Sequence, residues 1–199
     1  EADGAELAAL LHDRVEEALR EEEGLPFDAA EGLDDVLRHP GERADNTGAD
    51  TLSPTTGIGA ARTWAYNKFL EYSAANEDRL EVSYLKLDQT ICSVTSHKNI
   101  FAVLPGTDVD NHSVIVVEAH FDSRCEGSCD IACQAHGMED NGSGSALVLE
   151  LCRIMSQYTY KNTIVFMLTV GEEQGLYGAR AFAKYAQDND MNIEAVYNT

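Results

Sequence analysis

The feature that most constrains the fold of this chain is an apolar run at residues 163–170, with the sequence TIVFMLTV. Its residues are largely apolar and β-branched, which predicts a buried β-strand. Glu172 and Glu173 follow this strand almost at once, within the sequence GEEQG. In open α/β sheets, binding sites form at the carboxyl ends of the strands. The run therefore predicts an α/β fold whose sheet carries a pair of glutamates at its rim.

A second apolar run, at residues 113–119, also predicts a buried strand, and it ends at His120 and Asp122. These two residues alternate along an extended chain, so we expect their side chains to point the same way. A carboxylate beside a metal-binding histidine commonly accepts its second ring N–H and thereby fixes the tautomer. The pair therefore predicts a metal-binding histidine with its orienting carboxylate.

The third polar segment is EDNGSGS at residues 139–145, which contains Asp140. Its glycines allow the backbone to approach closely whatever Asp140 holds. The segment precedes a helical pattern whose apolar residues are expected on one face: Leu147, Leu151, Ile154 and Met155. Asp140 thus lies just before a helix, where an aspartate is also a common helix cap.

Each of these signals has an ordinary structural explanation when taken alone. Glu172 and Glu173 are consistent with a charged turn, because surface carboxylates are usually solvated. Two adjacent carboxylates nevertheless repel each other, and a bound metal ion is the common remedy. Since His, Asp and Glu follow one another at successive strand ends, we interpret them together as a metal site.

The order of the three motifs, HFD, EDNGSG and GEEQGLYGA, resembles the co-catalytic di-zinc aminopeptidases, the family of bacterial leucyl aminopeptidase and aminopeptidase Y. The resemblance covers residues 98–199. It implies a three-layer αβα sandwich with a mixed, centrally parallel sheet. It also implies a zinc-dependent aminopeptidase that uses two zinc ions to hydrolyse the N-terminal peptide bond of peptides or proteins.

By this resemblance, each candidate residue has an implied role. His120 would bind one zinc ion, Asp122 would orient His120, and Asp140 would bridge the two ions. Glu172 would be the general base, and Glu173 would bind the second ion.

The family's two remaining ligands, an Asp after the next strand and a late His, have no counterpart within residues 1–199. We therefore expect an N-terminal part of a larger enzyme, with a sheet truncated on its C-terminal side. The 199-residue chain alone is expected to be inactive, and its expected partner is the C-terminal part of the same protein. His136, four residues before Asp140, is a weaker candidate for an additional ligand.

Two alternatives to an aminopeptidase remain open. A glutaminyl cyclase-like acyltransferase has the same fold but a single zinc, and its site does not depend on a residue at the position of His120. A non-catalytic binding ectodomain with a degenerate site is the other alternative. The intact Glu172–Glu173 pair favours an enzyme.

Composition narrows the set of partners. The formal net charge of −21 argues against nucleic acid or an anionic membrane surface. The sequence has no apolar run of eighteen residues, so no membrane span is predicted. Residues 1–50 contain 16 acidic and 4 basic residues together with helical apolar patterns. We therefore expect an acidic helical N-terminal extension at 1–50 and the N-terminal part of a zinc peptidase domain at 51–199.

Other elements complete the predicted sheet. A helix is expected at residues 57–75, and strands at 79–87 and 99–104 are expected to form an antiparallel edge. The strands near Ser113, Thr163 and Ile193 should form its centre.

The chain has five cysteines, three of which lie in one loop between His120 and Asp140: Cys125, Cys129 and Cys133. Their spacing lacks the paired C-x2-C pattern of structural zinc sites, so a disulfide within this loop is expected. Such a staple is typical of exported proteins, which favours a secreted or periplasmic enzyme. Cys152 is expected to be buried in a helix, and the state of Cys92 is not predicted.

Overall fold

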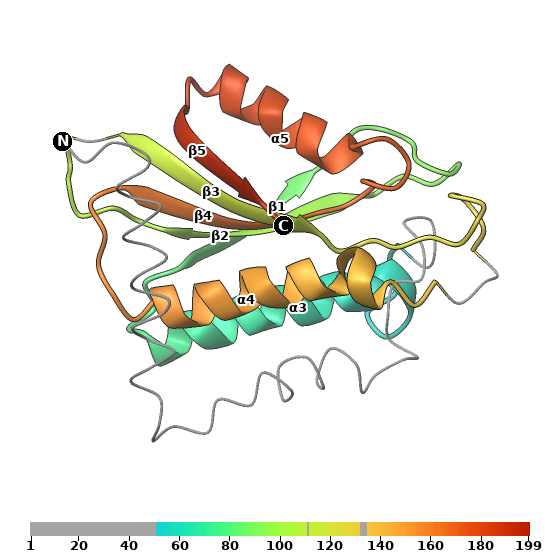
Figure 1. The fold of residues 1–199 in the computed structure, drawn as a ribbon, viewed down its shortest axis with the longest axis horizontal. Coiled ribbons are helices and arrows are strands. Elements are labelled where there is room, and N and C mark those ends of the chain that lie inside the picture. Colours follow the sequence, from blue (N-terminus) through green and yellow to red (C-terminus); the bar gives the residue numbers. More distant parts are fainter. Residues whose placement is uncertain (1–50, 111, 132–134) are drawn as a thin grey trace.

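The computed structural model describes residues 51–110, 112–131 and 135–199. In this part of the chain a mixed five-stranded sheet lies between two helices on one face and one helix on the other (Figure 1). The predicted three-layer αβα arrangement is therefore confirmed. The helices predicted within residues 1–50 lie outside the described residues.

The elements follow one another in the order helix, three strands, helix, strand, helix and strand. The helices are α3 (Gly57–Ala75), α4 (Ser143–Met155) and α5 (Tyr177–Asp188). The strands are β1 (Glu81–Lys86), β2 (Lys98–Leu104), β3 (Ser113–His120), β4 (Thr163–Thr169) and β5 (Asn192–Asn198). A short irregular helical turn at Met138–Gly142 leads directly into α4. The predicted helix at 57–75 and the predicted strands all form, whereas α5 has no explicit counterpart among the predicted elements.

The sheet has the strand order β1-β2-β4-β3-β5. Strands β4, β3 and β5 are parallel, while β2 is antiparallel to both β1 and β4. The antiparallel edge expected from the sequence is thus confirmed. On the other side, β5 pairs with β3 and presents alternately exposed residues, with Val196 56% exposed.

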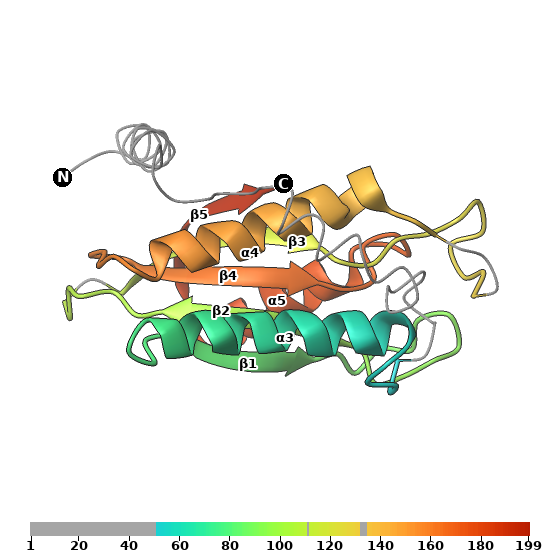
Figure 2. The ribbon, with the colours of Figure 1, turned by 90° about the horizontal axis from the view of Figure 1, so that it is seen from below.

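Each face of the sheet has its own apolar core. On one face, α3 and α4 lie side by side against the strands, and α5 covers the other face (Figure 2). The larger cluster includes Phe69, Val148 and Phe166, whereas the smaller one includes Met167 and Phe182. Burial of both faces explains why β3 and β4 have almost no polar positions, as the apolar runs predicted.

The orientation of α4 differs from the predicted one. The buried residues of this helix are Gly144, Ser145, Val148, Leu149, Cys152 and Met155. Of the predicted stripe, Met155 is buried and Leu147 is exposed. The physical reason is a second apolar stripe, because Val148, Leu149, Cys152 and Met155 all pack in the core, while Leu151 packs at its margin. At the start of the helix, the Ser145 hydroxyl donates to the His120 carbonyl oxygen at 2.9 Å.

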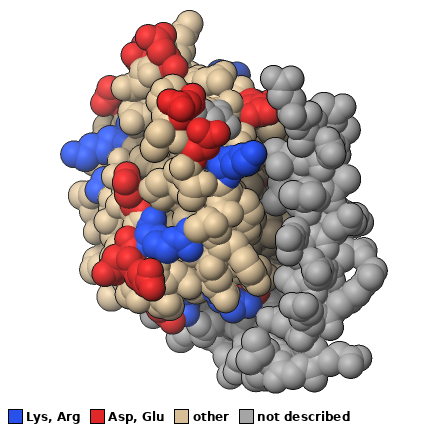
Figure 3. Space-filling view, turned by 90° about the vertical axis from the view of Figure 1, so that its left-hand side faces the viewer, with Lys and Arg blue, Asp and Glu red and all other residues tan. Residues whose placement is uncertain are grey.

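The end of the molecule at the amino termini of β3 and β4 is shown in Figure 3. There, Lys and Arg side chains lie among Asp and Glu side chains in the described part of the surface. Within the described residues, the helices are too short or too polar to cross a bilayer.

Candidate metal centre

The candidate residues gather at the carboxyl end of the two central parallel strands. His120 is the last residue of β3 and lies opposite Thr169, the last residue of β4. The chain leaves β4 through Gly171, whose φ of +73° is a conformation that favours glycine. A side chain at Gly171 would also approach Ile91 at 2.8 Å. This tight exit delivers Glu172 and Glu173 to the end of the sheet that carries His120.

His120 is the centre of the cluster. Its Nε2 atom lies 3.0 Å from Asp140 Oδ1 and 3.8 Å from Glu172 Oε2. On the other side of the ring, Nδ1 lies 3.0 Å from the backbone carbonyl oxygen of Asp122. A proton on Nδ1 donates to that carbonyl, so Nε2 is the ring nitrogen that faces Asp140 and that would bind a metal once it has lost its own proton. Of the predicted cluster of His120, Asp140 and Glu173 with Glu172 beside them, the structure brings His120, Asp140 and Glu172 together.

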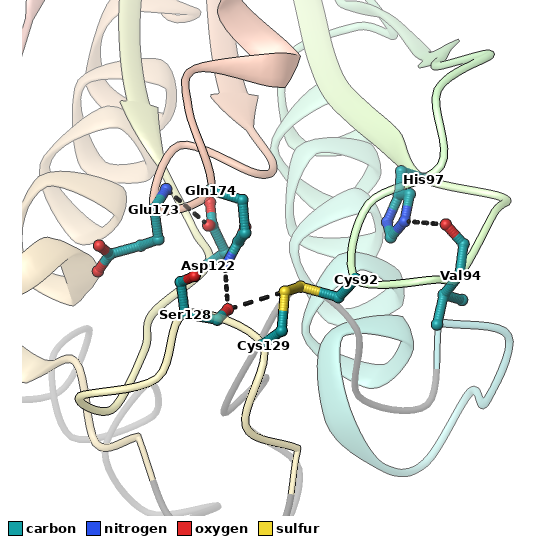
Figure 4. The surroundings of a disulfide bond; sticks show 8 residues. All are labelled: Cys92, Val94, His97, Asp122, Ser128, Cys129, Glu173 and Gln174. Carbon is teal, nitrogen blue, oxygen red and sulfur yellow. Dashed lines mark hydrogen bonds between the residues drawn. A yellow bond between two sulfur atoms is a disulfide. The ribbon is translucent and has the colours of Figure 1, made fainter.

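Asp122 acts differently from the expectation. Its carboxylate is 3.7 Å from His120 Nδ1, whereas its carbonyl oxygen is within hydrogen-bond distance. The fully buried carboxylate instead accepts the backbone N–H group of Glu172 at 3.2 Å. It also accepts the backbone N–H group of Glu173 at 3.3 Å (Figure 4). Asp122 therefore links the end of β3 to the turn after β4, and it fixes the backbone of both glutamates.

Glu173 is held by a cation of the protein itself. Its Oε2 atom accepts a hydrogen bond from Arg124 Nε at 2.7 Å. Burial raises the pKa of Glu173, the hydrogen bond from Arg124 opposes that rise, and the charge of Asp140 adds to it. Arg124 was not among the predicted site residues, because an isolated arginine in a loop carries no sequence signal of its position.

The charges around His120 decide its protonation in the absence of metal. Burial alone would lower its pKa, but hydrogen bonding to Asp122 and the charges of Asp122 and Glu172 raise the pKa of His120 to about 9. A proton on His120 therefore neutralises part of this acidic cluster at neutral pH.

The candidate ligands meet part of the geometry that a zinc ion requires. Two ligands at about 2.0–2.1 Å from a tetrahedral zinc lie roughly 3.3 Å apart, close to the 3.0 Å between His120 Nε2 and Asp140 Oδ1. Within the described residues, no three His, Cys, Asp or Glu side chains come together closely enough to hold an ion. The residues thus fit one half of a zinc site, with Glu173 turned to Arg124. His136 is exposed in the preceding loop, and its ligand role stays a prediction.

A disulfide next to the site corrects the sequence analysis. Cys129 pairs with Cys92, 37 residues earlier in the chain, so the sequence missed this connection between two segments (Figure 4). Cys125 is disulfide-bonded as well, and the disulfide predicted within the loop stays a prediction. The spacing within the loop could not reveal the longer connection, because the fold brings the segment between β1 and β2 against this loop. Cys152 is buried and free, as predicted.

The disulfide is connected to the turn that carries Glu172 and Glu173. Ser128, the neighbour of Cys129, accepts a hydrogen bond from Gln174 Nε2 at 2.7 Å through its carbonyl oxygen. Gln174 directly follows Glu173 in the turn after β4 (Figure 4). The staple, the Ser128 carbonyl and the Gln174 amide therefore support this turn from the side opposite β3.

A buried carboxylate next to the centre was also missed. Glu118 in β3 accepts hydrogen bonds from Thr169 Oγ1 at 3.3 Å and from Asn198 Nδ2. These contacts join the carboxyl ends of β4, β3 and β5. A single Glu within an apolar run gives no sequence signal for such a cross-strand network.

Comparison with known proteins places this site in a family. The model of peptidase family M28 matches residues 99–199, which include every candidate ligand. The chain belongs to this peptidase family. A probable zinc metalloprotease of Pyricularia oryzae is 39% identical over 149 residues, which are 73% of this chain and 30% of that protein. The chain spans about a third of the length of the curated M28-like relatives it matches.

Solved structures show the same fold. LapA of Legionella pneumophila superimposes with a TM-score of 0.71 at 21% identity, covering 94% of this chain and 46% of LapA. A glutaminyl cyclase of an Acidobacteriales bacterium superimposes with a TM-score of 0.64 at 19% identity, covering 85% and 57%. At these identities the likeness concerns the fold alone, so it does not separate a peptidase from a cyclase.

Proposed function

We propose that the full-length protein is a zinc-dependent aminopeptidase that removes residues from peptide or protein N-termini. The observation that carries this proposal is the position of His120 Nε2, 3.0 Å from an Asp140 oxygen and 3.8 Å from a Glu172 oxygen. Membership of peptidase family M28 and the zinc metalloproteases among its relatives support the same reaction.

His120 and Asp140 would hold one zinc ion, and Asp140 and Glu173 would hold a second. Each ion then has two ligands within residues 51–199, so we propose that the remaining ligands come from the rest of the protein. The 199-residue chain alone is therefore proposed to be inactive. Zinc, when bound, lowers the pKa of water and polarises a carbonyl group.

The residues of this chain supply the proton transfers. Glu172 faces the ring nitrogen of His120, so its carboxylate would accept the proton of the attacking water and return it to the leaving amine. Asp122 would keep Glu172 in place through the backbone N–H that its carboxylate accepts. Asp122 would also orient His120 through its carbonyl oxygen.

The alternative reaction is the acyl transfer of a single-zinc glutaminyl cyclase. A solved glutaminyl cyclase has a similar fold, so the fold is compatible with this reaction as well. A zinc count and an aminoacyl-anilide assay on the full-length protein separate the two. A hydrolase should release the anilide with two zinc ions bound, and His120→Ala should abolish the release. Cyclisation of N-terminal glutamine that survives His120→Ala would instead indicate the cyclase. Absence of both reactions, with no zinc bound, would indicate a binding ectodomain.

We also propose that the enzyme is secreted or periplasmic, because the Cys92–Cys129 disulfide is typical of an oxidising compartment. Residues 1–50 would form an acidic extension preceding the peptidase domain. Blocking thiols during lysis, followed by mass mapping of Cys92 and Cys129, tests the compartment, since a cytosolic protein should carry both as free thiols.

A further inference from the structure

We infer that Asn99 is a positioning residue for the turn that carries Glu172 and Glu173. Asn99 is the second residue of β2, and its side chain ties the two ends of this turn to the sheet. The role rests on the proposed function, because Glu172 is the general base proposed for that site.

The topology of the sheet places Asn99 at the same edge as the candidate site. β2 runs antiparallel to β4, so its first residues lie beside the carboxyl end of β4, where Ile100 pairs with Leu168. Because side chains alternate along a strand, Asn99 shares the α5 face of the sheet with Phe101, which packs against the cluster that contains Phe182. Asn99 is fully buried on this face, and a buried amide needs hydrogen-bond partners.

The Asn99 amide meets one backbone donor and one backbone acceptor. Its Oδ1 atom accepts a hydrogen bond from the Val170 N–H at 3.1 Å, and its Nδ2 atom donates to the Gly178 carbonyl oxygen at 2.9 Å. An N–H only donates and a carbonyl oxygen only accepts, so these two partners fix the orientation of the amide. A leucine or an ionised aspartate at this position could not make both bonds.

The two partners of Asn99 are the two ends of the turn. The Gly178 N–H donates directly to the Val170 carbonyl oxygen at 2.8 Å, so the turn is closed at its base, and both glutamates lie between these ends. A Cβ atom at position 178 would collide with Asn99 Oδ1 and lie 2.5 Å from the Val170 carbonyl oxygen. The closure therefore requires a glycine on one side and an amide side chain on the other.

Asn99 and Asp122 hold different parts of the turn. The Asp122 carboxylate binds the backbone N–H groups of Glu172 and Glu173 from the side of β3. Asn99 binds the base of the turn from the side of β2. Loss of the amide should therefore let the Glu172 carboxylate shift relative to His120. A displacement of about 1 Å at a reacting group costs about 10²-fold in rate.

Kinetics of the full-length enzyme on an aminoacyl anilide, with zinc in excess, test this role. Asn99→Leu removes both hydrogen bonds at nearly the same side-chain size. It should lower kcat about 10²-fold and change KM less than about threefold, because Glu172 acts in the chemical step. Asn99→Asp keeps the acceptor for the Val170 N–H and should lower kcat about tenfold, so this milder variant carries the test if Asn99→Leu does not fold. In both variants, hydrogen exchange measured by mass spectrometry should become faster at residues 171–177.

Ser73→Ala is the matched control. Ser73 is also buried, and its hydroxyl accepts the Leu80 N–H and donates to the Leu80 carbonyl oxygen, both at 3.0 Å. Leu80 directly precedes Glu81, which pairs with Val103 at the other end of β2, away from the turn. This variant should lose stability but keep kcat within about twofold.

A folded Asn99→Leu or Asn99→Asp variant with unchanged kcat and unchanged exchange at residues 171–177 would overturn the role of Asn99 alone. An equal loss of kcat in Ser73→Ala would also overturn it, since the effect would then follow stability. A wild-type protein that hydrolyses no aminoacyl anilide would overturn the proposed function, and the exchange at residues 171–177 would still decide whether Asn99 holds the turn.

Discussion

The two sides of the candidate centre differ in how they are prepared for metal. On the β3 side, His120 and Asp140 already bring a ring nitrogen and a carboxylate oxygen within 3.0 Å of each other. On the β4 side, Glu173 is paired with Arg124 at 2.7 Å. On the β3 side the charge that faces the carboxylate is a proton on the ring of His120 itself, whereas on the β4 side it is the guanidinium of a loop residue, Arg124. The comparison shows that strand ends fix where ligands lie, while loop residues decide what the ligands bind.

The supports of the two sides differ as well. His120 belongs to the hydrogen-bonded ladder of β3, so its backbone is fixed by the sheet itself. Glu173 lies beyond the ladder, in a turn held by the Asp122 carboxylate and by the Gln174–Ser128 hydrogen bond. The β4 side therefore depends on side-chain contacts and on the disulfide next to Ser128.

The largest expected effect separates the two neighbouring glutamates. In the full-length protein, Glu172→Gln should keep the bound zinc but lower turnover about 10²–10⁴-fold, because a general base is removed. Glu173→Gln should instead lose zinc. Zinc content by elemental analysis and hydrolysis of an aminoacyl anilide measure both. Glu194→Gln, on the exposed edge strand β5, should change neither. An unchanged rate in Glu172→Gln would show that another group is the base.

Removal of the disulfide should act mainly on the β4 side. Replacing Cys92 and Cys129 by serine opens a loop with a sequence separation of 37, which should lower the free energy of unfolding by about 4 kcal/mol. Denaturant unfolding measures the loss. In the folded variant, hydrogen exchange should increase at Glu172 and Glu173 more than at His120. Equal increases on both sides would contradict the difference in support.

The protonation of His120 should make zinc binding on the β3 side depend on pH. The pKa of His120 is raised to about 9, so the proton must leave before Nε2 can bind metal. Apparent zinc affinity should rise about tenfold per pH unit from pH 7 and level off near pH 9. The stability that the protonated ring provides is complete below about pH 6.5 and disappears as pH rises through 9.

Chelator competition at several pH values, with an NMR titration of the imidazole in the metal-free protein, measures both trends. His112→Gln removes an exposed histidine and should leave the pH dependence unchanged. A zinc affinity that does not change between pH 7 and 9 would contradict a protonated His120.

The smallest expected effect concerns Gln174. Gln174→Leu removes the hydrogen bond to the Ser128 carbonyl oxygen, which should lower the free energy of unfolding by about 1 kcal/mol. Gln187→Leu, at an exposed position of α5, is the matched control. Denaturant curves of the two variants should therefore differ. Identical curves would show that the amide of Gln174 does not support the turn.

The sequence predicted the strands and the residues at their ends, because apolar runs with both faces buried leave a strong pattern. His120, Glu172 and Glu173 can be located in this way from the sequence alone. The pattern failed for α4, which carries two overlapping apolar stripes and buries the one that contains Val148, Leu149 and Cys152. It also failed for Arg124, whose partner is 49 residues away in the chain.

The pairing of Cys129 is a second contact between distant segments that the sequence did not predict. Spacing within a loop suggests a local staple, but Cys129 pairs with Cys92 on a separate segment. Contacts between side chains of distant loops are created by the packing of the sheet, and no short motif records them. The sequence therefore predicted the ligands of the centre but not the groups that hold them.

The most direct test is a crystal structure of the full-length protein with zinc, with data collected at the zinc absorption edge. The account predicts anomalous peaks about 2.0–2.2 Å from His120 Nε2 and from an Asp140 oxygen, with a Glu173 oxygen bound to metal as well. Peaks at His136 or at the loop cysteines, with His120 still bonded to Asp140 and Glu173 to Arg124, would contradict it.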